Sequence, residues 1–364
     1  MAGHFGFLLH PLEVSDVYRK IPAAKKVPPR WLEAVMPYAP VIYTSHITGV
    51  RSPYNEAEGH FVSVPLTPRL MMSLPEEKVL PKLIQAAKVA EKKGARIIGL
   101  GAYNAIVAGA GVELAQALDI GVTTGNSYTA ATAVEGALLG AQEMGIDPEG
   151  AQVAVVGATG SVGRVAAILL ARQVKNLLLV GRDGARLQTL AEEVQRLTGL
   201  QPRISTDLHA SLIVSDVIIT VSNAVGAIIQ PEDLKTGAVV CDIARPRDVS
   251  RQVAEVRKDV LVIEGGVVDV PGEVDFHFNF GLPPRQALAC MAETMILALE
   301  ERYDDFTLGK EYSLEKVEEI IRLAKKHGFK VGGLRSFERA LSPDELESIR
   351  EHARRRRAQG AAGD

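Results

Sequence analysis

The chain has 364 residues, of which 47% are apolar and 23% charged, and its formal net charge is −3. The length predicts two domains and a small third piece, and so slight a charge imbalance gives no general reason to expect nucleic acid or a membrane as a partner. The apolar run 5–9 is too short for a signal peptide, and the longest uncharged run, 97–112, is shorter than the ~20 residues of a spanning helix. Two distant cysteines make no disulfide framework. These features indicate a cytoplasmic protein.

The first 147 residues have the pattern of an α/β domain of their own. A proline-rich, basic stretch at 25–30 predicts an exposed loop. Short apolar runs predict strands, and apolar residues at helical spacing predict helices with lysines on the outer face. The predicted elements are strands at 41–43, 60–64 and 95–100 and helices at 75–93 and 130–144.

Two polar loops that contain glycine, 99–103 and 123–129, each follow a predicted strand and precede an alanine-rich helix. Loops at the carboxyl ends of strands are where α/β domains bind ligands. The same residues are equally suited to cap the helices that follow. Both interpretations stay open for Asn126, Ser127 and Tyr128.

Residues 152–183 carry the clearest motif of the chain. A short β-branched strand at 153–156 is followed by Gly157, Gly160 and Gly163, an apolar helix and a second buried strand. In a dinucleotide-binding fold the first glycine permits a tight turn, the second lets the backbone approach a pyrophosphate, and the third allows close packing of helix on strand. The phosphates would then bind at the helix N-terminus.

The end of the second strand favours NADPH over NADH. NAD sites usually have an acidic residue there for the ribose 2′-hydroxyl, whereas this chain has Arg182 followed by Asp183. Arg182 is suited to a charge-assisted pair with a 2′-phosphate, although an arginine in a loop can also be simply solvated. Asp183 keeps NAD open as an alternative.

Three later strands, at 215–221, 238–242 and 260–263, complete a predicted parallel, doubly wound sheet. Their ends, which include Ser222 and Gly265, are expected to face the cofactor. The full predicted cofactor set is Gly157, Thr159, Gly160, Ser161, Val162, Gly163, Arg182, Ser222 and Gly265.

The last part of the chain is predicted to be helical, with helices at 285–303, 313–326 and 342–357 and Ser342 as the last N-cap. The fold class is therefore α/β, with an N-terminal α/β domain, a doubly wound Rossmann domain and a C-terminal helical segment. The predicted division is 1–147, 148–275, 276–337 and, for a polar helix with a basic tail, 338–364.

Pattern alone does not single out a nucleophile. Cys290 lies about two turns into the predicted helix 285–303, with Arg285 and His277 nearby in sequence. A thiolate nucleophile needs an adjacent base or positive charge, so a buried structural cysteine is the favoured interpretation, as it is for Cys241 in its apolar strand. No cluster has the spacing of metal ligands, and no Ser-His-Asp arrangement is recognisable.

Several segments resemble the long-chain acyl-[acyl-carrier-protein] reductases, the fatty-aldehyde-forming enzymes of cyanobacteria. The matching segments are FGFLLHPLE at 5–13, TTGNSYTA at 123–130, VAVVGATGSVG at 153–163, EGGVVD at 264–269, PPRQALACMAET at 283–294 and KHGF at 326–329. The segment with the cysteine is the most specific. The resemblance implies an α/β substrate domain, a shikimate-dehydrogenase-like NADP domain and a closing helical segment. The N-terminal quarter and residues 338–364 depart from the cyanobacterial pattern.

The resemblance reverses the interpretation of Cys290. It implies that Cys290 takes an acyl group from a long-chain thioester on acyl carrier protein or coenzyme A, and that NADPH reduces the acyl-cysteine to an aldehyde. His277, Ser127 and Tyr128 are the further catalytic candidates, with Ser127, Tyr128 and Asn126 considered as oxyanion donors. A divalent cation such as Mg²⁺ is not readable from the sequence. The implied partners are the acyl thioester and, for release of the aldehyde, a peripheral contact with a membrane, but no nucleic acid.

Two other functions are compatible with the sequence. A shikimate-dehydrogenase-type oxidoreductase would transfer hydride directly, with a lysine or aspartate as acid and base, and would not need the Cys290 thiol. A non-catalytic NADPH-binding protein of lipid metabolism would use the basic run 354–357 to dock an acidic carrier, although a solvated helix end explains that run more simply.

Overall fold

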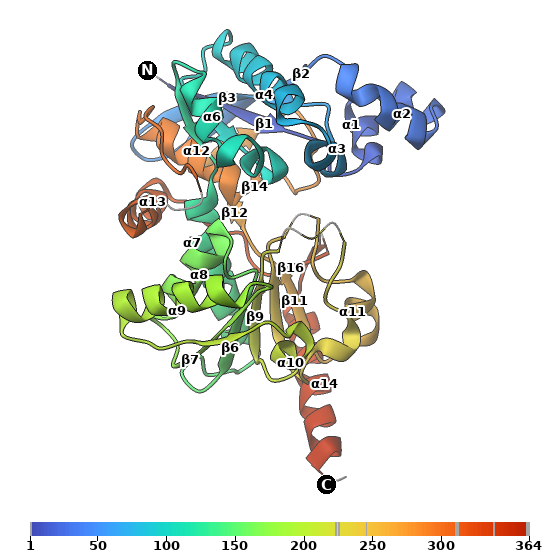
Figure 1. Cartoon of the computed structure of the whole chain (residues 1–364), viewed down its shortest axis with the longest axis vertical. Helices are drawn as coiled ribbons and strands as arrows, with labels where there is room; N and C mark the ends of the chain where they lie inside the picture. Colours follow the sequence, from blue (N-terminus) through green and yellow to red (C-terminus); the bar gives the residue numbers. More distant parts are fainter. Residues whose placement is uncertain are drawn as a thin grey trace. The chain divides into compact units, whose positions relative to one another are not determined.

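The computed structural model (Figure 1) describes residues 2–222, 224, 226–244, 246–309, 313–337 and 339–361. The chain forms two compact units, each made of two separate segments. Unit 1 comprises Met1–Tyr128 and Val268–Lys330, and unit 2 comprises Thr129–Val267 and Val331–Asp364. This division differs from the predicted one, because most of the predicted closing segment, with Cys290, belongs with the N-terminal residues.

Unit 1 is built on a six-stranded sheet with the order β13-β2-β3-β1-β4-β5. Strands β3, β1, β4 and β5 run parallel, and β2 is antiparallel to both of its neighbours. The strands are β1 (Gly3–Leu9), β2 (Ile42–Arg51), β3 (Glu56–Ser63), β4 (Ile97–Leu100), β5 (Gly121–Thr123) and β13 (Gly272–Asp275). The sequence pattern did not predict β1, which lies near the centre of the sheet, and predicted only the first residues of β2.

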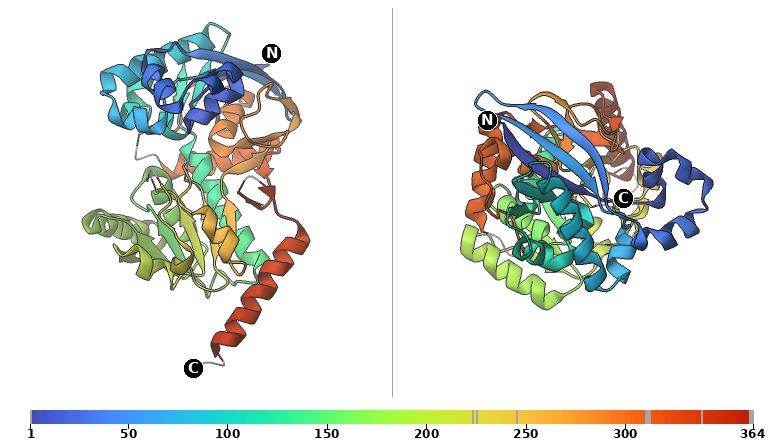
Figure 2. Two further views of the ribbon diagram at one scale, coloured as in Figure 1. Left: turned by 90° about the vertical axis from the view of Figure 1, so that its right-hand side faces the viewer. Right: turned by 90° about the horizontal axis from the view of Figure 1, so that it is seen from above.

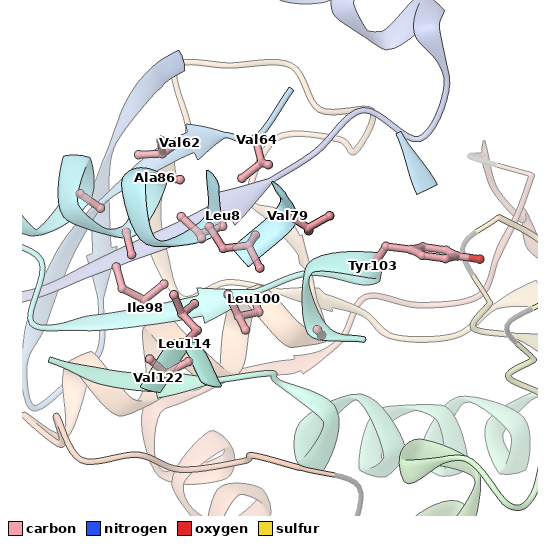
Figure 3. Close-up of a cluster of buried hydrophobic side chains, with 14 of the residues drawn as sticks. Leu8, Val62, Val64, Val79, Ala86, Ile98, Leu100, Tyr103, Leu114 and Val122 are labelled. Carbon is pink, nitrogen blue, oxygen red and sulfur yellow. The ribbon is translucent and has the colours of Figure 1, made fainter. Parts of the chain in front are cut away.

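Strand β1 shows how the sheet divides its residues between two helices. Alternate residues of a strand point to opposite faces. Gly6 and Leu8 face α4 (Glu76–Glu91), whereas Gly3 lies against α12 (Ala289–Leu299). The face toward α4 forms the aliphatic core of Figure 3, which includes Val62, Ile98, Leu100 and Val122. Helix α12 is apolar on nearly all sides and buried.

Further helices complete unit 1. Between β1 and β2 the chain forms η1 (Val14–Asp16), α1 (Val17–Lys20), η2 (Pro22–Lys26), α2 (Pro29–Val35) and η3 (Met36–Tyr38). The remaining helices are α3 (Pro68–Ser73), η4 (Ala102–Ala105), α5 (Val107–Ala110), α6 (Val112–Gln116) and α13 (Leu314–His327). The segment 14–38, defined here as the projecting segment, stands away from the sheet of unit 1 (Figures 1 and 2). Residues 25–30 are exposed, as predicted, but they comprise the end of η2, a two-residue link and the start of α2 rather than one loop.

Unit 2 confirms the predicted doubly wound sheet. Its strand order is β11-β10-β9-β6-β7-β8, and every pair is parallel. This is the 3-2-1-4-5-6 order of dinucleotide-binding folds. The strands are β6 (Gln152–Val156), β7 (Asn176–Val180), β8 (Arg203–Ser205), β9 (Val217–Thr220), β10 (Val239–Asp242) and β11 (Leu261–Glu264). Strand β8 was not predicted, because it is an edge strand with a polar, largely exposed sequence.

The helices of unit 2 flank this sheet. They are α8 (Ser161–Leu170), α9 (Gly184–Thr198), α10 (Leu208–Leu212), η5 (Pro231–Asp233) and α11 (Arg251–Val256). Helix α7 (Asn126–Glu143) carries the chain from unit 1 into unit 2. A third sheet has the order β14-β12-β15, from Gln286–Leu288, Val267–Asp269 and Lys330–Val331. The chain ends with the hairpin β16 (Arg335–Ser336) and β17 (Arg339–Ala340) and the helix α14 (Pro343–Ala361), whose N-terminal Glu345 N–H is capped by Ser342, as predicted.

Candidate active site

The helix that carries Cys290 lies directly on the sheet of unit 1. Three of its residues, spaced four apart, contact glycines. A β-carbon built on the glycine would stand 2.1 Å from the Ala298 carbonyl oxygen at Gly3, 2.0 Å from Thr294 Oγ1 at Gly99 and 2.3 Å from Cys290 Cα at Gly125. Residues four apart share one face of a helix. Because Gly3 begins β1 and Gly99 lies near the end of β4, α12 runs antiparallel to these strands and places Cys290 at their carboxyl ends, where α/β folds bind ligands.

Cys290 is the second residue of α12, not a residue two turns into a longer helix. Residues 286–288 form β14 beside β12, and the helix begins only at Ala289. Arg285 has φ +65°, and its carbonyl accepts a hydrogen bond from the Val270 N–H at 2.8 Å, which holds this stretch in the strand pairing. In the first turn of a helix the dipole stabilises a negative charge. The corrected helix start therefore removes the objection that Cys290 lies beyond the reach of the dipole.

Glu293, one turn after Cys290, is a site residue that the sequence analysis missed. Its carboxylate is fully buried and accepts hydrogen bonds from Thr123 Oγ1 at 2.5 Å and from the Tyr128 N–H at 2.8 Å. Burial raises the pKa of Glu293, and these hydrogen bonds together with one from the Thr307 side chain oppose the rise. It is the only carboxyl group in an otherwise apolar helix. That isolated charge is the signal by which the sequence could have revealed it.

Thr307 also holds the segment after β5 in place through hydrogen bonds. Its hydroxyl lies 2.8 Å from Ser127 Oγ, and its carbonyl accepts hydrogen bonds from the Thr124 N–H at 2.9 Å and the Thr124 hydroxyl at 3.0 Å. Thr123 Oγ1 also accepts the Thr307 N–H at 3.2 Å. The loop after β5 is thus held by Glu293 and Thr307 while Gly125 touches Cys290. Its polar side chains are buried among one another, and this gives the loop a fixed shape.

The structure gathers some of the predicted catalytic residues and separates others. Ser127 and Tyr128 lie in the first turn of α7, directly after the loop that contacts Cys290, and both are buried. Their role as oxyanion donors stays a prediction. Asn126 is the first residue of α7.

His277 lies at the opposite edge of the sheet from β5. It follows β13, where its Nδ1 lies 3.0 Å from the His46 carbonyl oxygen and its Nε2 lies 3.4 Å from the Asp275 carboxylate. Strands β13 and β5 are the two edges of the sheet, with four strands between them. At ~4.8 Å per strand spacing the two edges are about 24 Å apart. His277 therefore does not join the Gly125–Cys290 cluster, although it is near Cys290 in sequence.

A second cluster of polar residues lies at the carboxyl ends of β1 and β4. Strand β4 is the neighbour of β5 in the sheet. His10 Nε2 accepts the Tyr103 N–H at 3.1 Å, and its Nδ1 lies 3.0 Å from the Pro11 carbonyl oxygen. Burial lowers the pKa of His10 to about 4, so the ring is neutral and has one defined tautomer. Asn104 is fully buried and donates to the Leu8 carbonyl at 2.9 Å. In Figure 3 the Tyr103 ring extends away from the aliphatic core.

The glycine turn of unit 2 has the geometry that a dinucleotide site needs. Gly157 has φ +77°, and a β-carbon there would stand 2.8 Å from the Val221 carbonyl oxygen. A β-carbon on Gly163 would stand 2.3 Å from the Gly157 carbonyl oxygen. Gly160 is the N-cap of α8 without a side-chain cap, and a β-carbon on it would meet only the Gly157 carbonyl oxygen, at 3.3 Å. The first and third glycines thus serve the packing, and the second leaves the helix N-terminus open to a phosphate.

Two arginines lie at the end of β7. Arg182 is exposed, and Arg186, in the first turn of α9, donates to the Thr159 carbonyl at 3.0 Å. Asp183 caps α9 by accepting the Arg186 N–H at 3.1 Å. Asp183, the residue that left NAD as an alternative cofactor, is therefore used as a helix cap. Arg182 and Arg186 lie beside the glycine turn. Arg186 was not predicted, because only its helix register brings it back to Thr159.

The predicted residues at the later strand ends are fixed by packing. Ser222 donates its N–H at 2.8 Å and its hydroxyl at 2.5 Å to the fully buried Asp248. A β-carbon on Gly265 would stand 2.3 Å from Ile243 Cγ2 and 2.7 Å from Cys241 Sγ. These contacts explain Ser222 and Gly265 as structural residues of the strand ends, and their contact with a cofactor stays a prediction. Cys241 is fully buried, which agrees with its structural interpretation.

Three further features concern metals, membranes and the basic tail. Among the described residues, no three His, Cys, Asp or Glu side chains gather as metal ligands do. No described helix has the length and apolar character to cross a membrane.

The arginines of the tail contact unit 2 itself or neighbouring turns of α14. Arg354 and Arg355 pair with Glu347 and Glu351, Arg356 lies 3.1 Å from Asp259, and Arg357 donates to the Thr236 carbonyl.

Comparison with known proteins gives similarities over both units. Residues 139–264 match the family model of shikimate / quinate 5-dehydrogenase. The chain is 33% identical over 251 residues to the aminotransferase PigE of a Serratia species, an alignment that covers 67% of this chain but only 29% of that protein. It is 29% identical over 307 residues to the long-chain acyl-[acyl-carrier-protein] reductase of Synechococcus elongatus, which covers 80% of this chain and 87% of that protein.

Among solved structures, L-tryptophan dehydrogenase from Nostoc punctiforme aligns with 97% of this chain and 89% of its own at 15% identity and a TM-score of 0.39. That alignment is too loose to carry an argument about function. The sequence similarities are those of a distant relative of oxidoreductases whose nucleotide-binding unit resembles that of the shikimate dehydrogenases.

Proposed function

We propose that the protein reduces a long-chain acyl thioester to a fatty aldehyde with NADPH, through an acyl-cysteine at Cys290. The observation that carries the proposal is the position of Cys290 in the first turn of α12, at the carboxyl ends of parallel strands and against Gly125. The similarity to a cyanobacterial acyl-carrier-protein reductase supports the choice of substrate.

The chemistry begins with the thiolate. Cys290 Sγ attacks the carbonyl carbon of the thioester, the bond from that carbon to the carrier sulfur breaks, and the carrier leaves as a thiol. NADPH, when bound, supplies a hydride to the acyl carbon of the resulting acyl-cysteine. Collapse of the tetrahedral species breaks the bond to Cys290 and releases the aldehyde. In sum one thioester, one NADPH and one proton give one aldehyde, one NADP⁺ and the carrier thiol.

The residues around Cys290 would orient the thiol and stabilise the oxyanion. The loop after β5 is fixed by the buried Glu293 and by Thr307, so its N–H groups and the Ser127 hydroxyl can be held in place before the reaction starts. Preorganised donors of this kind are usually the largest single contribution to catalysis of acyl transfer. Glu293 contacts the loop and not the reacting atoms, so we assign it a positioning role.

The residues of unit 2 fit the cofactor. The open N-terminus of α8 at Gly160 would hold the pyrophosphate, and Arg182 with Arg186 would hold the 2′-phosphate. Arg182 and Arg186 favour NADPH over NADH, because their positive charges can pair with the negative 2′-phosphate that NADH lacks. Asp183 cannot make such a pair.

Intact-protein mass spectrometry tests the proposal. The protein is mixed with a long-chain acyl thioester, on acyl carrier protein or on coenzyme A, in the absence of NADPH. We expect one acyl adduct on the wild type and on Cys241→Ala, none on Cys290→Ala, and loss of the adduct as aldehyde when NADPH is added. Absence of an adduct with both donors, together with retained reductase activity of Cys290→Ala, would favour direct hydride transfer of the shikimate-dehydrogenase type.

A further inference from the structure

The projecting segment 14–38 carries exposed apolar side chains that the proposed reaction does not use. Trp31, Val35 and Tyr38 have exposed fractions of 60%, 54% and 84%. Their spacing of four and three residues places Trp31 and Val35 on one face of α2 and continues that face into η3. Met36, between them in η3, is buried. The segment therefore turns Trp31, Val35 and Tyr38 to solvent.

The acidic residues of this segment form ion pairs, whereas three of its basic residues are exposed. Its two acidic residues are paired within unit 1, Asp16 with Arg19 at 3.5 Å and Glu33 with Arg69 on α3. Lys25, Lys26 and Arg30 are exposed, and Arg30 lies over the Trp31 ring at 6.0 Å. The outer surface of the segment is thus cationic and aromatic, without an exposed carboxylate of its own to oppose an anionic partner.

We infer that the projecting segment binds the surface of a bilayer that contains anionic lipid. Tryptophan and tyrosine beside lysine and arginine are the side chains that settle at the level of lipid headgroups. A bilayer needs no matching pocket, and the segment stands out from the sheet of unit 1 in the views of Figures 1 and 2. Bilayer binding needs none of the proposed chemistry.

Trp31 is the only tryptophan of the chain, so its fluorescence reports on this segment alone. The full-length protein is titrated with vesicles of phosphatidylcholine with and without phosphatidylglycerol, and indole emission and co-sedimentation are measured. We expect a blue shift and co-sedimentation with the anionic vesicles, much weaker binding to the neutral ones, and loss of binding as salt screens the charges.

Matched variants separate this surface from general stickiness. Lys25→Gln/Lys26→Gln/Arg30→Gln should weaken partitioning about fivefold per charge, on the order of a hundredfold in all. The same change at three exposed lysines, Lys78 and Lys88 of α4 and Lys92 directly after it, should have little effect. Val35→Ser/Tyr38→Ser should also weaken partitioning and leaves Trp31 as the probe, whereas Val214→Ser/Val256→Ser, at exposed positions of unit 2, should not.

Three results would overturn the inference. The first is absence of both the shift and co-sedimentation with anionic vesicles. The second is a Trp31 emission that is already blue-shifted without lipid and depends on protein concentration, since a second copy would then cover the face. The third is a shift with an acidic acyl carrier protein but not with vesicles, which would make the segment a protein-docking surface. The assay contains neither thioester nor NADPH, so its outcome is separate from that of the proposed reaction.

Discussion

Gly125 touches the main chain of Cys290. A β-carbon on Gly125 would stand 2.3 Å from the Cα and 2.5 Å from the Cβ of Cys290, and the residue has φ +72°, a conformation that glycine adopts at little cost. The loop after β5 and the first turn of α12 are therefore in contact at the residue that carries the thiol. Any displacement of this loop would move Cys290 relative to the donors we propose for the oxyanion.

Gly125→Ala should reduce acylation of Cys290 by on the order of a hundredfold, because a shift of about 1 Å at a reacting group can cost that much. The rate of adduct formation with a long-chain acyl thioester, followed by mass spectrometry, measures the loss. NADPH binding, measured by fluorescence, should be unchanged since its residues belong to unit 2.

Gly136→Ala on α7 is the matched control. A β-carbon there meets no atom within 4 Å, and alanine favours a helix over glycine by up to about 1 kcal/mol. This variant should acylate at the wild-type rate and be as stable or more so. Equal acylation by both variants would show that the Gly125 contact does not position the thiol.

The nucleotide unit was predictable from sequence because its signals are local. Strand, glycine turn and helix follow one another within 152–183, and β-branched runs mark most of the later strands. The start of α12 was not predictable from sequence. Residues 286–288, which the local pattern assigns to the helix, instead form β14 and pair with β12. Prolines at 283 and 284 suit a helix start, and only a positive φ at Arg285 turns the chain into the strand.

The candidate site around Cys290 depends on contacts between distant residues. The resemblance to a family pointed to Cys290, whereas no local pattern places Gly125 against it or connects Glu293 to Thr123. His277 shows the opposite case. It is near Cys290 in sequence, yet the sheet order places it beside β13, at the opposite edge of the sheet from β5.

Glu293→Gln should change how stability depends on pH. Burial raises the pKa of this carboxyl, so the folded state keeps the proton over a range in which the unfolded state has lost it. Stability therefore falls as pH rises from about 4.5 through the raised pKa. Thermal unfolding at a series of pH values should show this fall in the stability of the wild type relative to the variant, which cannot titrate at position 293.

At neutral pH the same substitution should cost about 1–3 kcal/mol, because an amide cannot accept from both Thr123 and Tyr128 as the carboxylate does. Glu135→Gln, an exposed position on α7, serves as the control and should leave both the stability and its pH dependence as they are. An unchanged pH slope in Glu293→Gln would mean that the buried carboxyl does not titrate in this range.

His10 should make the protein sensitive to acid. Burial lowers its pKa from 6.5 to about 4, so the unfolded state binds the proton first. The contribution of His10 to the free energy of unfolding is fully present above pH 6.5. It decreases by about 3 kcal/mol as the pH falls toward 4. His10→Gln keeps an acceptor for the Tyr103 N–H without titrating, and should lose that much less stability over the same range.

His209 is a control of the opposite sign. Its hydrogen bond with Asp233 raises its pKa, so its contribution is present at low pH and is lost as pH rises. His209→Gln should therefore make the protein less stable in acid, not more. Chemical denaturation at a series of pH values distinguishes the two histidines, and identical curves for both variants would contradict the assignment.

Arg182→Gln/Arg186→Gln should weaken the preference for NADPH. Both cations lie at the end of β7 beside the glycine turn, and Asp183 is engaged as the cap of α9. Loss of a charge-assisted pair with a phosphate costs about 1.5–3 kcal/mol, which corresponds to roughly ten- to a hundredfold in the dissociation constant of NADPH. NADH has no 2′-phosphate, so its affinity should change little. Calorimetric titration with both nucleotides measures the difference, and Arg196→Gln, exposed near the end of the same helix, controls for the loss of charge. A parallel loss of affinity for NADH would show that the arginines hold the pyrophosphate or the fold of the turn rather than the 2′-phosphate.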